Sequence, residues 1–193
     1  MTLEQRCYRT LIVSSNENFI KEIGSLLSVE SHHKESASSA SQARRMLLEN
    51  VYDFVIVNAP LTDEFGTRLC TDAGSNNSTV TVLFTANDVY EEVYDKVAVR
   101  GVFVIHKPTS GSVISQALSL LVSARERLRT VEKRAGKAES KIAEIRVVNK
   151  AKWFLIDHED MSEADAHQYI EKAAMDAGIT KVQAAQMIIE KYG

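Results

Sequence analysis

The stretch TLIVSSNE, residues 10–17, decides the fold, because it joins a short apolar run directly to a pair of serines. Apolar runs of this kind occur four times, at residues 10–13, 53–58, 80–85 and 102–106. Segments with apolar residues at helical spacing separate them. Strands that are apolar throughout indicate a parallel sheet buried on both faces. The sequence therefore predicts an α/β fold with a five-stranded doubly wound parallel sheet, in which HHKESAS, residues 32–38, is a weakly indicated second strand.

Functional side chains of such folds lie at the carboxyl ends of the strands. In this chain those positions hold Ser14, Ser15, Asn58, Thr85 and Lys107. Residues 8–122 resemble the receiver domain of bacterial response regulators, in the segments LIVSSNE, YDFVIVNAPLTDEFG, VLFTAND and GVFVIHKP. The resemblance implies an acidic pair that holds Mg²⁺, an aspartate that accepts phosphate, and a threonine and a lysine that complete the switch. Thr85 and Lys107 match this pattern, whereas Ser14, Ser15 and Asn58 replace its three acids.

These replacements change the expected chemistry of the pocket. Mg²⁺ sites of this type depend on carboxylates, and a carboxamide is not a nucleophile for phosphate. We therefore interpret the domain as a pseudo-receiver with no metal and no cofactor, in which Lys107 contacts Asn58 or nearby carbonyl groups. The alternative is an active phospho-switch, in which one of the neighbouring carboxylates, Glu17 or Asp63, accepts the phosphoryl group in place of Asn58.

A long helix follows, since the chain contains no proline from Ile114 to its end. Apolar or small residues recur there in alternating steps of three and four, which is the pattern of a coiled coil. We predict a homodimer through this seam, with a polar position at Asn149. The alternative is one amphipathic helix packed against its own chain. The seam residues are Leu121, Leu128, Val131, Ile142 and Ile145.

The last part of the chain predicts three short helices, of which the first continues the long helix to about Ile156. Ser162 and Thr180 are the expected N-caps of the other two, and Gly178 the expected C-terminal stop. The predicted inward residues are Ala166, Tyr169, Ile170, Ala173, Ala174, Val182, Ala185, Ile188 and Ile189.

The stretch NKAKWFLIDHEDMSEADAHQYIEKAAMDAGITKVQAAQMII, residues 149–189, resembles the ANTAR domain. Trp153 and Ile156 depart from the family pattern, which usually has glycine and methionine there. The resemblance implies binding to paired stem-loops in nascent mRNA leaders, which prevents a terminator from forming.

Charge gives weaker support for RNA binding. Residues 125–152 hold 10 Lys and Arg against 4 Asp and Glu, but residues 153–193 hold 3 against 8. Trp153 and Tyr169 could stack on unpaired bases or pack in the core. The RNA-binding candidates are Arg146, Lys150, Lys152, Trp153, Tyr169, Lys172 and Lys181.

The sequence thus predicts a pseudo-receiver domain at 1–111, a coiled-coil linker at 112–140 and an ANTAR-like three-helix domain at 141–193. The expected function is transcription antitermination without enzymatic activity, controlled by a protein partner or a ligand at the pseudo-receiver. The alternative is a protein-interaction adaptor whose acidic tail binds no RNA. Two isolated cysteines and the lack of a long apolar run or signal segment favour a cytoplasmic protein with no membrane contact.

Overall fold

The computed structural model describes residues 6–75 and 78–192. The chain divides into two compact units, Met1–Thr130 and Val131–Gly193. Residues 1–5 and 193, at the ends of the first and last predicted domains, lie outside the described residues.

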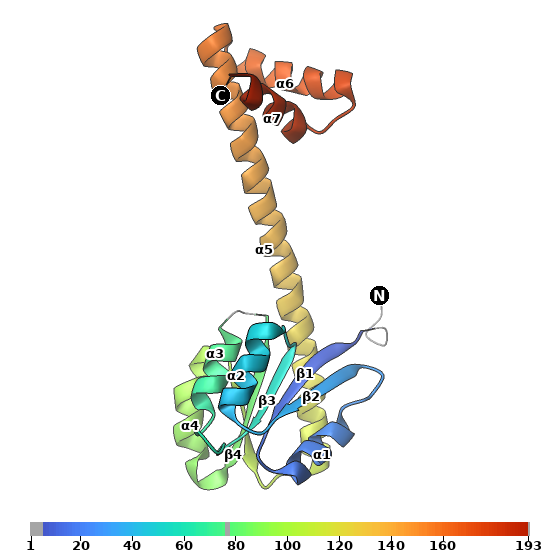
Figure 1. Ribbon diagram of the computed structural model, residues 1–193, viewed down its shortest axis with the longest axis vertical. Coiled ribbons are helices and arrows are strands. Elements are labelled where there is room, and N and C mark those ends of the chain that lie inside the picture. Colours follow the sequence, from blue (N-terminus) through green and yellow to red (C-terminus); the bar gives the residue numbers. More distant parts are fainter. Residues whose placement is uncertain (1–5, 76–77, 193) are drawn as a thin grey trace. The chain divides into compact units, whose positions relative to one another are not determined.

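The first unit contains the predicted five-stranded parallel sheet, in the order β2-β1-β3-β4-β5 (Figure 1). The order confirms a doubly wound sheet, with a change of winding direction between β1 and β3. The strands are β1 (Tyr8–Val13), β2 (His32–Ala37), β3 (Phe54–Asn58), β4 (Val80–Ala86) and β5 (Phe103–Lys107).

Helices cover both faces of this sheet (Figure 1). Alternate side chains of a strand point to opposite faces, so Leu11 and Val13 pack with α2, α3 and α4, while Ile12 packs with α1 and the start of α5. The helices are α1 (Glu17–Leu26), α2 (Ala40–Glu49), α3 (Thr67–Gly74), α4 (Tyr90–Val97) and α5 (Gly111–Glu159), with 3₁₀ turns η2 (Asn87–Val89) and η3 (Ala98–Arg100) on either side of α4.

The two edge strands account for the irregular sequence signals. β2 is polar because it lies at the edge beside β1, where Glu35 forms an ion pair of 2.7 Å with Arg9. β5 lies at the opposite edge, and the prediction that it is buried on both faces is wrong: Phe103 is 45% exposed. An edge strand has a neighbour on one side only, which leaves even apolar side chains partly open to solvent.

A capping box begins α2. The Ser39 hydroxyl accepts a hydrogen bond from the backbone N–H of Gln42 at 3.2 Å. The Gln42 side-chain oxygen accepts a hydrogen bond from the backbone N–H of Ser38 at 2.9 Å, one residue before the N-cap.

The beginning of α5 is part of the sheet unit. Ile114, Leu118 and Leu121 are buried against β1, β3 and β4, and Leu128 packs at the margin of the same cluster. Leu121 is therefore covered by the sheet of the same chain and does not suit the predicted dimer seam, whereas Leu128 is only partly covered and its place in the seam stays a prediction.

The second unit is built from the rest of α5, α6 (Glu163–Ala177) and α7 (Lys181–Tyr192). Ser162 and Thr180 accept hydrogen bonds from backbone N–H groups three residues later, at 3.2 Å each, and Gly178 has a φ of 64° at the end of α6. These three features confirm the predicted helix ends. The buried core consists of Ala151, Leu155, Ala166, Ile170, Ala174, Ala184, Ala185 and Ile188.

Two predictions about this unit need correction. α5 ends at Glu159 rather than near Ile156. Tyr169 was expected to point inward but is 45% exposed, because α6 turns its alanine-rich side to the core.

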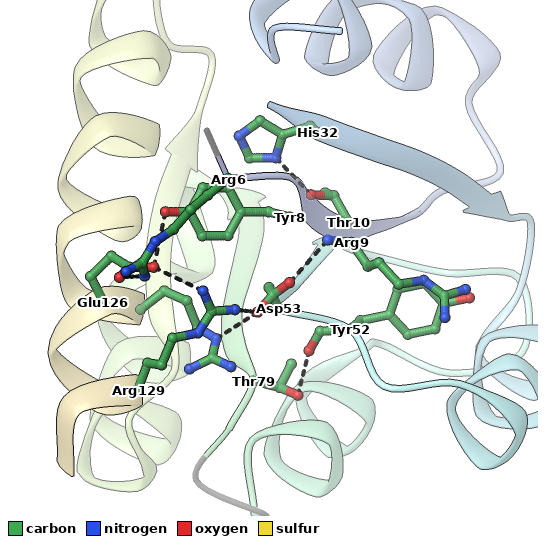
Figure 2. Close-up of polar contacts among 11 residues, drawn as sticks. Arg6, Tyr8, Arg9, Thr10, His32, Tyr52, Asp53, Thr79, Glu126 and Arg129 are labelled. Atoms are coloured by element: carbon green, nitrogen blue, oxygen red, sulfur yellow. Dashed lines mark hydrogen bonds and ion pairs between the residues drawn. The ribbon is translucent and has the colours of Figure 1, made fainter. Parts of the chain in front are cut away.

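A carboxylate anchors α5 to the amino-terminal edge of the sheet (Figure 2). Asp53 lies just before β3 and accepts hydrogen bonds from Arg125 Nε at 2.9 Å and Arg129 Nη2 at 3.2 Å. Its other oxygen accepts the backbone N–H of Arg9 at 3.0 Å. Arg125 is only 5% exposed, so Asp53 neutralises a buried cation.

Glu126 strengthens this anchor from the helix side (Figure 2). Its carboxylate accepts the Tyr8 hydroxyl at 3.0 Å and pairs with Arg6 and with Arg129, the latter at 3.3 Å. The first strand and α5 are thus joined by side chains more than one hundred residues apart in sequence.

We predict that Asp53→Asn destabilises the protein by about 3 kcal/mol, because it removes a carboxylate that neutralises the buried Arg125. Chemical denaturation followed by circular dichroism measures this loss. Glu92→Gln is the matched control, since it breaks the exposed Glu92–Lys96 pair and should leave the midpoint unchanged. Equal midpoints for the two variants would contradict the anchor's role.

Candidate functional site

A hydrogen-bonded chain links three of the residues predicted at the carboxyl edge of the sheet. Lys107 Nζ donates to Asn58 Oδ1 at 2.5 Å and to the carbonyl oxygen of Ala59 at 2.7 Å. Asn58 Nδ2 in turn donates to Ser14 Oγ at 2.9 Å. The predicted contact between Lys107 and Asn58 is therefore confirmed, and burial lowers the pKa of Lys107.

The two serines have different environments. Ser14 is buried, and its hydroxyl also accepts the backbone N–H of Asn16 at 3.0 Å. Ser15 is exposed and lines an open pocket of about 470 Å³ together with Glu17 and Gln42. At the positions of the family's acidic pair, the Ser14 hydroxyl is therefore buried and hydrogen-bonded, and the Ser15 hydroxyl is exposed.

Thr85 lies at the same edge of the sheet but takes no part in the hydrogen bonds that join Lys107, Asn58 and Ser14. It is fully buried, and its hydroxyl has no hydrogen-bond partner among the residues that the structure describes. The carboxyl edge of the sheet thus holds one buried hydroxyl without a partner among the described residues, beside the hydrogen bonds that join Lys107, Asn58 and Ser14.

The side chains at the positions of the family's three acids are poorly suited to bind Mg²⁺. Ser14, Ser15 and Asn58 are neutral, and the Lys107 ammonium already occupies the Asn58 oxygen. A hard divalent cation is bound through carboxylates and phosphate oxygens, which these side chains do not supply. Across residues 6–75 and 78–192, no three His, Cys, Asp or Glu side chains are grouped so as to hold a metal ion.

Asp63, one of the two carboxylates that could act as a substitute acceptor, accepts hydrogen bonds from residues at the start of α2. It accepts the backbone N–H groups of Ala40 at 2.9 Å and Ser41 at 2.8 Å, and the Ser41 hydroxyl at 2.7 Å. These bonds, with that of the Ser41 hydroxyl the strongest, lower the pKa of Asp63 to about 2. Glu17, the other candidate, is exposed in the first turn of α1 and lies 3.7 Å from Lys21.

In the second unit, part of the predicted RNA-binding set borders a groove of about 360 Å³. Lys141, Lys152, Lys181 and His167 line it. Lys152 donates to Glu163 at 2.9 Å, and Lys181 pairs with Glu171. Each lysine lowers the pKa of its carboxylate partner, so the positive charge of the groove is partly neutralised within the unit.

Other candidates lie outside this groove. Trp153 is 68% exposed, so core packing does not explain it. Arg146, Lys150 and Lys172 are exposed as well. The structure therefore distributes the seven predicted residues over more than one surface of the unit.

A row of aromatic and cationic side chains was missed by the sequence analysis. Lys150 Nζ lies 5.8 Å from the ring centre of Phe154, and the Phe154 and His158 rings are 5.9 Å apart and stacked. His158 is 5.4 Å from the Tyr192 ring, over which Lys191 Nζ lies at 4.4 Å. We call these five residues the aromatic row. The four-residue spacing of Lys150, Phe154 and His158 was a signal that could have revealed part of it.

Comparisons with known proteins agree with this geometry. The model of the ANTAR domain matches residues 136–189. Transcriptional regulatory protein PdtaR of Mycobacterium tuberculosis strain H37Rv is 24% identical over 190 residues, covering 96% of this chain and 91% of that protein.

Solved receiver domains share the fold of the sheet unit. The signal receiver domain of an HD domain-containing protein from Pseudomonas fluorescens Pf-5 has a TM-score of 0.59 at 24% identity, covering 67% of this chain and 96% of that one. A CheY-like receiver domain protein from Methanospirillum hungatei JF-1 has a TM-score of 0.57 at 18% identity, covering 63% and 98%.

Both units of the chain are thus similar to parts of known proteins. In particular, the chain carries an N-terminal receiver-like fold and a C-terminal ANTAR domain, and along nearly its whole length it is similar to PdtaR. None of the helices in the described parts of the chain has the length and apolar character needed to cross a membrane.

We predict that Asp63→Asn flattens the acid end of the stability profile. The folded-state pKa of about 2 lies below the ordinary value of 3.8, so the folded protein binds fewer protons between these values. The stability that Asp63 contributes is complete above about pH 4 and is lost as the pH falls toward 2. Urea denaturation between pH 2 and 5 measures this, and an unchanged slope in the variant would contradict the assignment.

Proposed function

We propose that the protein is a non-enzymatic regulator of transcription antitermination that binds stem-loop RNA in nascent mRNA leaders, in the cytoplasm. The ANTAR domain at residues 136–189 is the observation that carries this proposal. The exposed cations of the second unit support it, since phosphate contacts supply much of the affinity for RNA.

We infer that the receiver-like unit does not carry phosphoryl chemistry. Asn58 offers an amide where a carboxylate nucleophile is needed, and its oxygen already accepts from Lys107. Asp63 is held by the start of α2. Control of the RNA-binding unit would then come from a protein partner or a ligand that docks on the receiver-like unit.

A homodimer through α5 fits this function. Val131, Ile142 and Ile145 are each at least half exposed, and they continue the heptad spacing beyond the part of α5 that the sheet covers. A second copy of the helix would bury these side chains. Two RNA-binding units joined in this way suit two adjacent stem-loops, because linked sites raise the effective concentration. We propose that the coiled coil begins in the predicted linker, residues 112–140, which connects the sheet to the RNA-binding domain.

The rival function is a protein-interaction adaptor that binds no RNA. Residues 153–193 favour it, because they hold 8 Asp and Glu against 3 Lys and Arg. Purification that recovers a stoichiometric protein but no RNA, even at low salt, would support the adaptor.

We predict that the protein shifts a two-hairpin leader RNA in a gel, and that Arg146→Gln and Lys152→Gln each weaken binding. Loss of one phosphate contact should lower the slope of log affinity against log salt by roughly 0.7 to 0.9. Lys96→Gln in the sheet unit is the control, since Lys96 is an exposed lysine paired within its own helix. Equal affinity for scrambled RNA would count against specific recognition.

We also predict that acetyl phosphate with Mg²⁺ leaves the protein unphosphorylated. Intact-mass spectrometry after incubation should show the unmodified mass, because neither Asn58 nor Asp63 is available as an acceptor. An active receiver domain in a parallel reaction is the positive control. A phosphoryl adduct mapped to the sheet unit would disprove this part of the proposal.

A further inference from the structure

The aromatic row differs in chemistry from the lysine-lined groove. It brings the rings of Phe154, His158 and Tyr192 together between two cations, Lys150 and Lys191. His158 has a side chain 42% exposed, and Phe154 and Tyr192 are half-buried. The rings are therefore held in place at one edge while remaining open to a ligand.

Two carboxylates beside the aromatic row, Asp157 and Glu159, offset its positive charge. Asp157 Oδ2 lies 3.4 Å from His158 Nδ1. Glu159 accepts the Tyr192 hydroxyl and lies 4.0 Å from Lys191 Nζ. A surface with this charge balance attracts phosphate weakly, so its chemistry favours ring stacking over contact with an RNA backbone.

Tyr169 on α6 is a further exposed aromatic side chain of this unit. Its side chain is exposed and close enough to Lys191 to contribute, after Tyr192 and Glu159, to raising the pKa of that lysine. The end of α5 and the end of α7 thus meet in the aromatic row, and α6 adds the exposed ring of Tyr169.

We propose that the aromatic row, with Tyr169, is the surface on which unpaired bases of the RNA loop stack. The inference rests on the proposed RNA-binding function and assigns base stacking to a surface separate from the cationic groove of Lys152 and Lys181. Every base has a π face, and stacking on aromatic side chains is the common way in which proteins hold unpaired RNA bases.

Binding of full-length protein to an RNA hairpin that carries 2-aminopurine in its loop tests this proposal. Stacking should quench the fluorescence of the base, and Phe154→Leu and Tyr169→Leu should each remove the quench and weaken binding at least about 5-fold. The salt dependence of binding should stay as in the wild type, because no phosphate contact is lost. Lys152→Gln with Lys181→Gln should give the opposite result, with a lower salt slope and the quench retained.

Two further variants separate stacking from folding. Phe154→Trp keeps an aromatic face and should restore quench and affinity, and circular dichroism checks that Phe154→Leu remains folded. Tyr94→Leu is the matched control, since Tyr94 is an exposed tyrosine of the sheet unit.

Each outcome decides a different point. If the wild type binds the hairpin but the Phe154 and Tyr169 variants keep its affinity and quench, the row is not the stacking surface and the RNA-binding function stands. The row would then be a surface for a protein. If the wild type binds no hairpin, the proposed function and the stacking surface both fail. A lowered salt slope in the Phe154 variant would also overturn the stacking assignment.

Discussion

Asp53 carries a negative charge where β3 begins, and two arginines of α5 bind it at the amino-terminal edge of the sheet. Arg125 is almost completely buried, and a buried cation is stable only beside a partner that neutralises it. The constraint works in both directions: the sheet needs α5 to cover its apolar face, and α5 needs Asp53 to bury Arg125. The first part of α5, the helix that continues into the second unit, is therefore fixed by the receiver-like fold.

The opposite, carboxyl edge of the sheet is stabilised by hydrogen bonds around Lys107 and Asn58. There the Lys107 ammonium is satisfied by an amide and a backbone carbonyl, and the amide is satisfied by Ser14. No cluster of like charges remains that a cation would have to neutralise. The fold thus has the architecture of a receiver, while hydrogen bonds from the Lys107 ammonium and the Asn58 amide satisfy the side chains at the positions of the family's acids.

Local signals in the sequence predicted local structure well. Ser162, Thr180 and Gly178 were assigned correctly because a cap is decided by residues within one turn. The central strands were clear because their apolar runs are buried on both faces. The Lys107–Asn58 contact followed from topology, since the carboxyl ends of parallel strands meet at one edge. Long-range partners were not predictable: the same heptad spacing suits a sheet or a second helix, so Leu121 was misassigned. Asp53 and Arg125 are 72 residues apart, and Tyr192 joins Phe154 and His158 only through the fold of the bundle.

The central claim is that the pocket of Ser14, Asn58 and Lys107 is complete without a metal ion or a phosphoryl group. Titration of the isotope-labelled protein with Mg²⁺, followed by the backbone amide signals of Ser14, Asn58 and Thr85, tests it most directly. The account predicts no saturable shift of these signals at Mg²⁺ concentrations that saturate an active receiver domain. A saturable shift centred on Ser14 and Asn58 would contradict it.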